Sequence, residues 1–218
     1  MESLPNPFIL LAGMSVLALA PFVAIMVSSY IKIVVVLYIL RNGLGLPQVP
    51  PNIAVNGLAI ILSLYIMAPV GFSMVEAFNQ HDVRLDDFRN PAFAQALQDG
   101  AQPLTAFLKK HSDDTERRFF AQSTKKLWPN DKVASVDEDH LLVLLPSFTI
   151  SELKSAFQIG FMLYLPFIVI DLIVSNILLA MGMIMVSPMM ISLPFKILLF
   201  VMVDGWTRLI HGLVLSYA

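Results

Sequence analysis

A methionine-rich stretch near the C-terminus has the most distinctive side-chain chemistry in this sequence. Five of the twelve methionines fall within ten residues, namely Met181, Met183, Met185, Met189 and Met190. Thioethers bind soft metal ions such as Cu(I), and their flexible, unbranched side chains also fill irregular apolar gaps. No Cys or His lies nearby, and Pro188 interrupts the helical spacing. A deformable apolar seal, ordinary packing and, with the least support, a metal site remain as interpretations. We predict no metal ion and no cofactor.

Ionisable residues inside apolar segments form the second group with possible chemistry. They are Asp171, Lys196, Asp204 and Arg208. A charge at the bilayer centre costs at least ~2.5 kcal/mol, so such groups are expected to be paired or to face protein. Asp204 precedes Arg208 by four residues, the order that favours a helical ion pair. For Lys196 we predict a buried pair with Glu152, within one chain or between subunits, and Asp171 is the rival partner.

Catalytic chemistry finds little support in the sequence. Two membrane-embedded acids could serve an intramembrane protease, but neutralisation of Asp204 by Arg208 explains that acid more simply. The four histidines are isolated from one another, and no phosphate-binding loop or nucleophile motif is present. We therefore predict that the chain is not an enzyme. A small-molecule or metal-ion transporter that uses Asp171, Lys196 and the methionines is the alternative function.

The elements that hold these residues are apolar. The chain is 57% hydrophobic and 14% charged, against roughly 25% charged residues in a soluble domain. Runs long enough to cross a bilayer, about 20 residues each, are Phe8–Leu40, Asn52–Val75, Phe157–Val186 and Met189–Tyr217. As one helix the first would extend roughly 50 Å, so we expect Pro21 to kink or divide it.

Between these segments lies a polar, mainly helical region. Residues 76–154 hold 13 of the 16 carboxylates and 10 of the 14 Lys and Arg residues. One helix is predicted from Pro91 to Lys110, a second from the cap Asp113 to Lys126, and a short third that Asp137–Asp139 open and that leads to Leu141–Leu145. We predict an all-α chain with hydrophobic hairpins at 1–75 and 155–218 flanking this domain. Its net negative charge argues against a nucleic-acid partner.

Orientation depends on two charges. Positive residues favour the cytoplasmic side of a membrane, and Arg41 and Lys196 flank the two hairpin turns. Both turns are thus expected in the cytoplasm, with the termini and residues 76–154 outside. Because the first residues carry Glu2 and no positive charge, we expect no cleavable signal.

Several long motifs follow one another along the chain, namely Lys32–Leu37, Arg41–Asn52, Pro146–Phe161, Pro166–Asp171, Ser192–Lys196 and Asp204–Trp206. Together and in this order, they resemble the FliP/SctR family of type III export-gate proteins. The resemblance covers nearly the whole chain outside the polar domain. The short N-terminus without a signal is more similar to the virulence-type (SctR) branch than to the flagellar one.

The resemblance implies a pentameric ring in the bacterial inner membrane, lifted toward the periplasmic side. Its partners would be SctS/FliQ-like and SctT/FliR-like proteins, and its substrates unfolded secreted proteins. The family's pore gasket of three methionines after a glycine falls here on Met183, Ile184 and Met185. Ile184 is stiffer because it is β-branched. The neighbouring Met181, Met189 and Met190 would form a secondary gasket.

Overall fold

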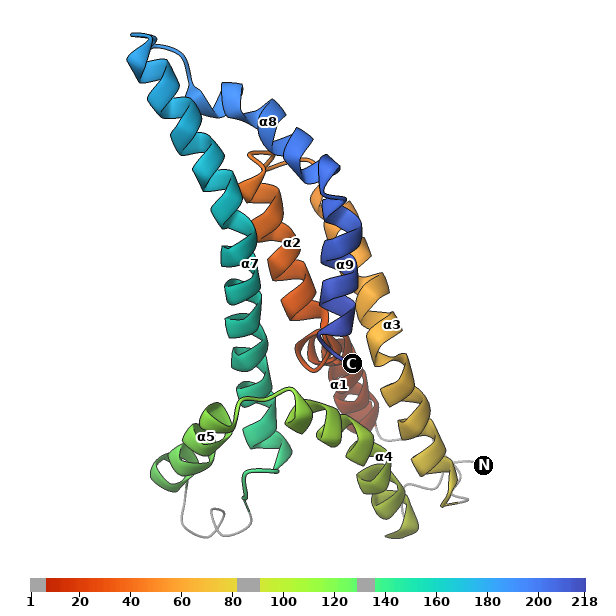
Figure 1. Ribbon diagram of the computed structural model, residues 1–218. Coiled ribbons are helices and arrows are strands. Elements are labelled where there is room, and N and C mark those ends of the chain that lie inside the picture. Colours follow the sequence, from red (N-terminus) through yellow and green to blue (C-terminus); the bar gives the residue numbers. More distant parts are fainter. Residues whose placement is uncertain (1–6, 82–90, 129–135) are drawn as a thin grey trace.

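The computed structural model describes residues 7–81, 91–128 and 136–218 (Figure 1). The described residues form helices and no strand, which confirms the all-α prediction. The helices are α1 (Pro7–Met26), α2 (Tyr30–Gly43), α3 (Asn52–Asn79), α4 (Pro91–Lys110), α5 (Asp114–Leu127), α7 (Leu141–Ala180), α8 (Pro188–Met202) and α9 (Gly205–Leu215).

The apolar segments form two long helices and two bent pairs. By length and composition, α3 and α7 are each able to cross a membrane. The end of α1 meets α2 at 69°, and α8 meets α9 at 60°, so each pair is either one broken span or a re-entrant loop. At the second bend Asp204 adopts a left-handed conformation with φ of 53°, which Asp tolerates better than most residues. These apolar helices are those of a membrane protein.

The prediction that Pro21 divides the first apolar segment is wrong. Pro21 lies inside α1, and the helix instead breaks between Met26 and Tyr30. Two serines occupy the break: the Ser28 hydroxyl donates to the Ile25 carbonyl (3.3 Å), and the buried Ser29 hydroxyl bonds that of Ser63 (3.2 Å). Serine hydroxyls compete with the helical backbone for hydrogen bonds, which explains a bend at this point.

The predicted short helix opened by Asp137–Asp139 is also wrong, because the helix begins only at Leu141 and residues 141–145 are the first part of α7. The His140 side chain accepts a hydrogen bond from the Leu142 amide and caps this helix. From there α7 continues for 40 residues, about 60 Å at 1.5 Å per residue. The proposed domain boundary at 154/155 therefore lies within a continuous helix. Residues 82–90 and 129–135 of the proposed middle domain lie outside the described part.

Helix α2 lies at the centre of the bundle. It is buried along most of its length, although it carries Lys32 and Arg41. Apolar side chains from α2, α3, α7, α8 and α9 form one core cluster; its largest members on α2 are Ile33, Leu37 and Leu40. Figure 1 shows α2 between α7 on one side and α3 and α9 on the other. Any charge on α2 must therefore find its partner inside the protein.

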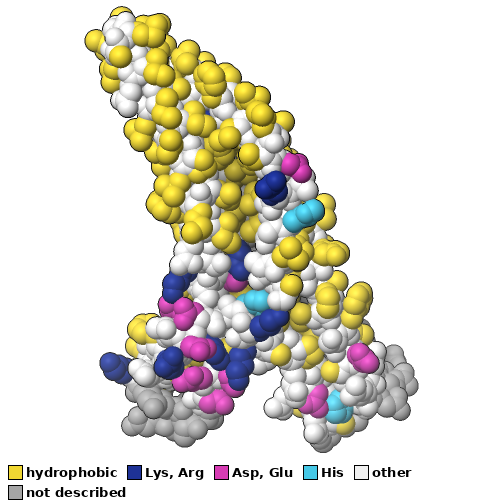
Figure 2. Space-filling model, in the orientation of Figure 1, with side chains coloured by type: hydrophobic (Ala, Val, Ile, Leu, Met, Phe, Trp, Pro, Cys, Tyr) yellow, Lys and Arg dark blue, Asp and Glu magenta, His cyan; other side chains and the backbone are white. Residues whose placement is uncertain are grey.

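The helices predicted between residues 91 and 127 are confirmed as α4 and α5, which lie at one end of the bundle. The Asp113 side chain caps α5 by accepting from the Thr115 amide (2.9 Å) and also accepts from Lys154 (2.9 Å). These bonds, with that from Lys154 the larger cause, lower the pKa of Asp113 to about 2. Figure 2 shows most of the charged side chains gathered at this end and a mainly apolar surface over the rest of the visible face, apart from a small group of basic, acidic and histidine side chains about halfway along the molecule.

Candidate functional site

The methionine loop, residues 181–187, joins α7 to α8 through a defined turn. The Gly182 amide donates to the Leu179 carbonyl (3.0 Å), and the Met183 amide donates to the Leu178 carbonyl (2.9 Å). This pair of bonds is the Schellman motif, which requires a left-handed residue, usually glycine, just after the helix. Gly182 supplies that conformation with φ of 72°. The local sequence thus ends α7 at a fixed point and in a fixed direction.

A second turn sets the positions of the predicted gasket residues. The Val186 amide donates to the Met183 carbonyl (3.3 Å), so Ile184 and Met185 occupy the two corner positions of a four-residue turn. Pro188 then starts α8 at its first position, where its missing N–H costs nothing. The predicted interruption of the helix between Met185 and Met189 is thereby confirmed.

The methionine loop projects from the molecule. Met185 is fully exposed, Ile184 is 80% exposed and Met183 is 40% exposed, and the side chains of Met181, Met189 and Met190 are exposed as well. Figure 1 places the turn between α7 and α8 at the end of the molecule opposite to α4 and α5. Exposed contiguous apolar surface of this kind usually marks a contact site.

Lys196 connects the helices that lead into and out of this loop. Its Nζ lies 2.6 Å from Asp171 Oδ2 and donates to the Gly43 carbonyl at 3.2 Å. The Ser192 hydroxyl bonds the other Asp171 oxygen at 2.5 Å. These contacts join α7, α8 and the end of α2 within two or three turns of the methionine loop. The rival pairing of Lys196 with Asp171 is therefore the one found within the chain.

The expected pair of Lys196 with Glu152 is wrong within one chain. Glu152 Oε1 instead lies 3.0 Å from Lys32 Nζ, and its other oxygen accepts a hydrogen bond from the Tyr217 hydroxyl. The Lys32 ammonium also lies 4.0 Å from the centre of the Tyr217 ring, within the range of a cation–π contact. Helix α2 places Lys32 against α7, and burial on both sides dictates this pairing. Lys32, Glu152 and Tyr217 are termed the Lys32 cluster below.

Aromatic side chains close the Lys32 cluster. The ring centroid of Tyr217 lies 5.0 Å from that of His111 and 6.1 Å from that of Phe107. His111 is half-buried, and its burial, followed by the charges of Lys32 and Lys110, lowers its pKa to about 4. These contacts give His111 a packing role beside the Lys32 cluster.

Asp204 and Arg208 do not form the expected ion pair among the described residues. The Asp204 carboxylate accepts from the Thr207 hydroxyl at 3.0 Å, and both charged side chains are exposed. The reason is local: Asp204 is the left-handed residue before α9 rather than part of that helix. The i,i+4 geometry assumed from the sequence therefore does not apply.

Arg41 organises the turn between α2 and α3. Its guanidinium donates to the Pro50 carbonyl (3.1 Å) and to Asn52 Oδ1 (2.7 Å), and it lies over the Tyr38 ring. Both charges used to predict orientation, Arg41 and Lys196, thus have structural partners inside the chain. The predicted orientation itself stays a prediction.

Sequence reasoning missed Lys32 and Tyr217 as partners of Glu152. A signal for Lys32 existed, because it is the one charge in the apolar segment Phe8–Leu40 and so required an acid. Nothing comparable pointed to Tyr217. Among the described residues, no three His, Asp or Glu side chains gather in a group able to hold a metal ion.

Comparison with known proteins adds relatives over the full length. The sequence model of the FliP family matches residues 13–213. Yop proteins translocation protein R of Yersinia pestis is 53% identical over 217 residues, which cover 100% of this chain and 99% of the relative. Hypersensitivity response secretion protein HrcR of Ralstonia nicotianae is 50% identical (92% and 93% covered), and virulence protein YscR of Salmonella typhimurium is 44% identical (99% and 100%).

Proposed function

This chain belongs to the FliP family, and from that premise we propose that it is a pore-forming subunit of a type III secretion export gate. Its relatives are named for translocation, secretion and virulence, which supports a role in a protein secretion apparatus. The finer proposal is that unfolded proteins pass through a channel lined, at its narrowest point, by the methionine loop.

The exposed apolar corner of the methionine loop carries this proposal. Met185 is fully exposed and Ile184 is 80% exposed in the monomer, yet the backbone beneath them is fixed by the bonds of Gly182 and Val186. At a channel axis, where the loop would meet water instead of lipid, two large uncovered apolar side chains would forgo about 1.5–3 kcal/mol each. A fixed backbone with uncovered apolar side chains is suited to meeting copies of itself around an axis.

A ring of such loops would act as a hydrophobic gate. Apolar constrictions block ions by excluding water, so Met183, Ile184 and Met185 from several subunits would close the channel at rest. Methionine side chains have three rotatable bonds and can part around a passing chain. Ile184 would make one layer of the seal stiffer, while Met181, Met189 and Met190 would form a flexible second layer.

A gate made of several methionine loops requires an assembly of several subunits. We infer a pentamer in the bacterial inner membrane, joined by SctS-like and SctT-like proteins, with α4 and α5 on the periplasmic side. This orientation agrees with the separation of the polar end from the methionine loop in Figure 1. Residues 1–75, 76–154 and 155–218 would serve as first hairpin, periplasmic domain and gate hairpin.

The transporter alternative has less support from the geometry. It would need Asp171 and Lys196 to be available for a substrate, whereas the two side chains bond each other at 2.6 Å. The apolar corner at Ile184 and Met185 also offers no polar group for a small solute.

Ion conductance of the assembled complex in a planar bilayer tests the gate. Replacing Met183, Ile184 and Met185 together by Ala should raise the resting conductance, because a wider and less apolar constriction wets more readily. A matched control replaces Met162, Ile173 and Met202, which are exposed on α7 and α8 away from the loop, and should leave conductance at the wild-type level. Equal conductance in both triple variants would defeat the proposed gate.

A further inference from the structure

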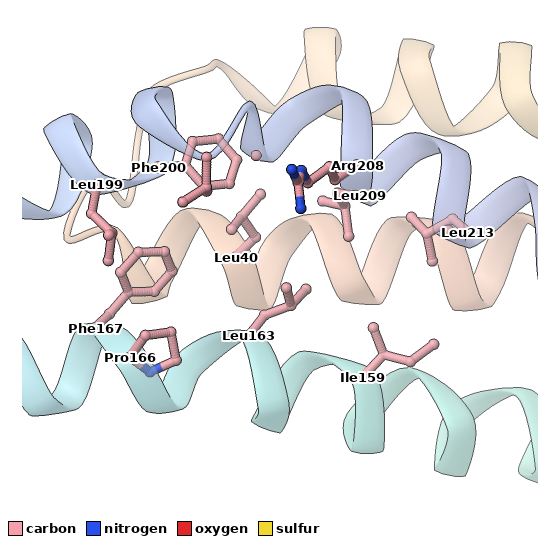
Figure 3. A pocket seen from close by; sticks show the side chains of 13 residues that line it. Leu40, Ile159, Leu163, Pro166, Phe167, Leu199, Phe200, Arg208, Leu209 and Leu213 are labelled. Carbon is pink, nitrogen blue, oxygen red and sulfur yellow. The ribbon is translucent and has the colours of Figure 1, made fainter.

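An apolar cleft of about 560 Å³ runs between α2, α7, α8 and α9. Its walls are apolar residues of these four helices, among them Leu40 from α2, Leu163 and Phe167 from α7, Phe200 from α8, and Leu209 and Gly212 from α9. Figure 3 shows these side chains converging from the separate helices. The cleft lies apart from the methionine loop and from the Lys196–Asp171 pair.

A single charged side chain, Arg208, lines this cleft. Figure 3 shows its guanidinium beside the apolar side chains of Leu40 and Leu209, while the residue as a whole is exposed. The acid closest to it in sequence, Asp204, bonds Thr207 instead. His211, one turn further along α9, is exposed but does not line the cleft. Across the residues that the structure describes, Arg208 has no ion-pair partner within 4 Å.

The apolar cleft and the unpaired guanidinium of Arg208 together define a class of ligand. The volume lies within the ~300–1,000 Å³ typical of small-molecule sites, and the wall can accept only an apolar body. A guanidinium with free donors matches a phosphate, which it binds through two parallel hydrogen bonds. The membrane offers molecules that carry both features.

We propose that this cleft binds an anionic glycerophospholipid, with an acyl chain between α7 and α9 and the phosphate on Arg208. The charge of Arg208 selects the headgroup, and the apolar wall holds the chain. The bound lipid fills the gap at the bend between α8 and α9, where the protein's own side chains leave space.

Gly212 keeps one side of the cleft open. A Cβ placed on Gly212 meets no atom within 4 Å, whereas one on Gly205 would lie 2.3 Å from the Phe200 ring. Because Gly212 lines the cleft, the backbone there has room for the Cβ of a larger residue. Gly57 on α3 is a matched control, because a Cβ there also meets nothing within 4 Å and the position does not line the cleft.

Lipid retention by the full-length protein tests the site. The purified chain is exposed to equal amounts of phosphatidylglycerol and phosphatidylcholine, and the retained lipids are counted by native mass spectrometry. The wild type should retain phosphatidylglycerol preferentially. Arg208→Gln should lower that preference about tenfold, the scale of one charge-assisted hydrogen bond, while Arg208→Lys and the remote Arg118→Gln keep most of it.

Filling the cleft gives a second, independent result. Gly212→Leu should reduce retention of both lipids, and Gly57→Leu should leave retention unchanged. Equal phosphatidylglycerol retention in wild type, Arg208→Gln and Gly212→Leu would overturn the proposal. So would a Gly212→Leu protein that keeps its lipid but no longer assembles, since the cleft would then be a protein contact.

Discussion

Two buried lysines in the described part of the chain, Lys32 and Lys196, have different surroundings. Lys32 and Glu152 are both enclosed, with side chains 5% and 2% exposed, and Tyr217 and the rings around it cover them. Lys196 is equally buried at 3%, but its partner Asp171 is 35% exposed. One ion pair is therefore sealed inside a single chain, whereas the other reaches the surface.

This difference separates a folding role from a positioning role. The Lys32 cluster ties α2, α7 and the C-terminal Tyr217 together far from the methionine loop, so it stabilises the bundle as a whole. The Lys196–Asp171 pair joins α7 to α8 beside the loop and leaves one face of the acid accessible. Loss of the Lys32–Glu152 pair should therefore unfold the protein. Loss of the Lys196–Asp171 pair should increase the motion of the methionine loop before it affects the rest of the fold.

The largest effect is expected from Glu152→Ala. This substitution leaves Lys32 buried without its acid, and removal of one partner of a buried pair typically costs ~3–5 kcal/mol. Thermal unfolding of the detergent-solubilised protein should show a large fall in midpoint or no folded protein at all.

A triple variant provides the control for this effect. Lys32→Met with Glu152→Leu and Tyr217→Phe removes both charges and the hydroxyl together, and apolar replacement of a buried pair is often close to neutral. This variant should recover most of the lost stability. A Glu152→Ala protein as stable as the wild type would show that the two lysine sites do not differ as described.

A smaller effect is expected from Asp171→Asn. Lys196 still donates to the Gly43 carbonyl, and the amide oxygen of Asn replaces the carboxylate oxygen as its second acceptor. Because Asp171 is already partly exposed to solvent, we expect the free energy of unfolding to fall by about 1–3 kcal/mol. Hydrogen exchange should rise in residues 181–187 more than in α2 or α3. Asp113→Asn removes an exposed pair with Lys154 but keeps a capping side chain. It should leave hydrogen exchange unchanged in residues 181–187 and in α2 and α3. Unchanged exchange in the loop would remove the positioning role from the Lys196–Asp171 pair.

The smallest effect concerns pH and His111. Its pKa is lowered to about 4 from an ordinary value of 6.5, so the unfolded chain binds a proton more readily than the folded one. Its contribution to stability is therefore full above about pH 6.5 and declines as the pH falls toward about 4. Unfolding midpoints at pH 7, 6, 5 and 4 should decline less steeply for His111→Gln.

The titration of Asp113 falls below the pH range of this measurement. Its pKa is about 2, below an ordinary value of 3.8, so its contribution is present above about pH 3.8 and is lost only at lower pH. Parallel pH profiles for the wild type and His111→Gln would show that His111 is not part of the packing around the Lys32 cluster.

Local patterns predicted much of the molecule. The cap at Asp113 and the interruption of the helix at Pro188 each depend on residues a few positions apart, and the structure confirms both. The polar stretch with α4 and α5 was also predictable from charge alone. The break at Ser28 and Ser29 was missed because a proline nearby gave the stronger signal, although the serine hydroxyls decide the bend.

The sequence by itself determined that the chain is helical, apolar and interrupted at a methionine-rich turn, because these properties follow from composition and short-range spacing. Only the tertiary structure decided which acid meets which lysine. Glu152 lies 120 residues from Lys32 in the sequence, and Asp171 lies 25 residues from Lys196. A buried charge accepts whichever opposite charge the packing of α2, α7 and α8 brings within about 3 Å, and no local rule specifies that packing.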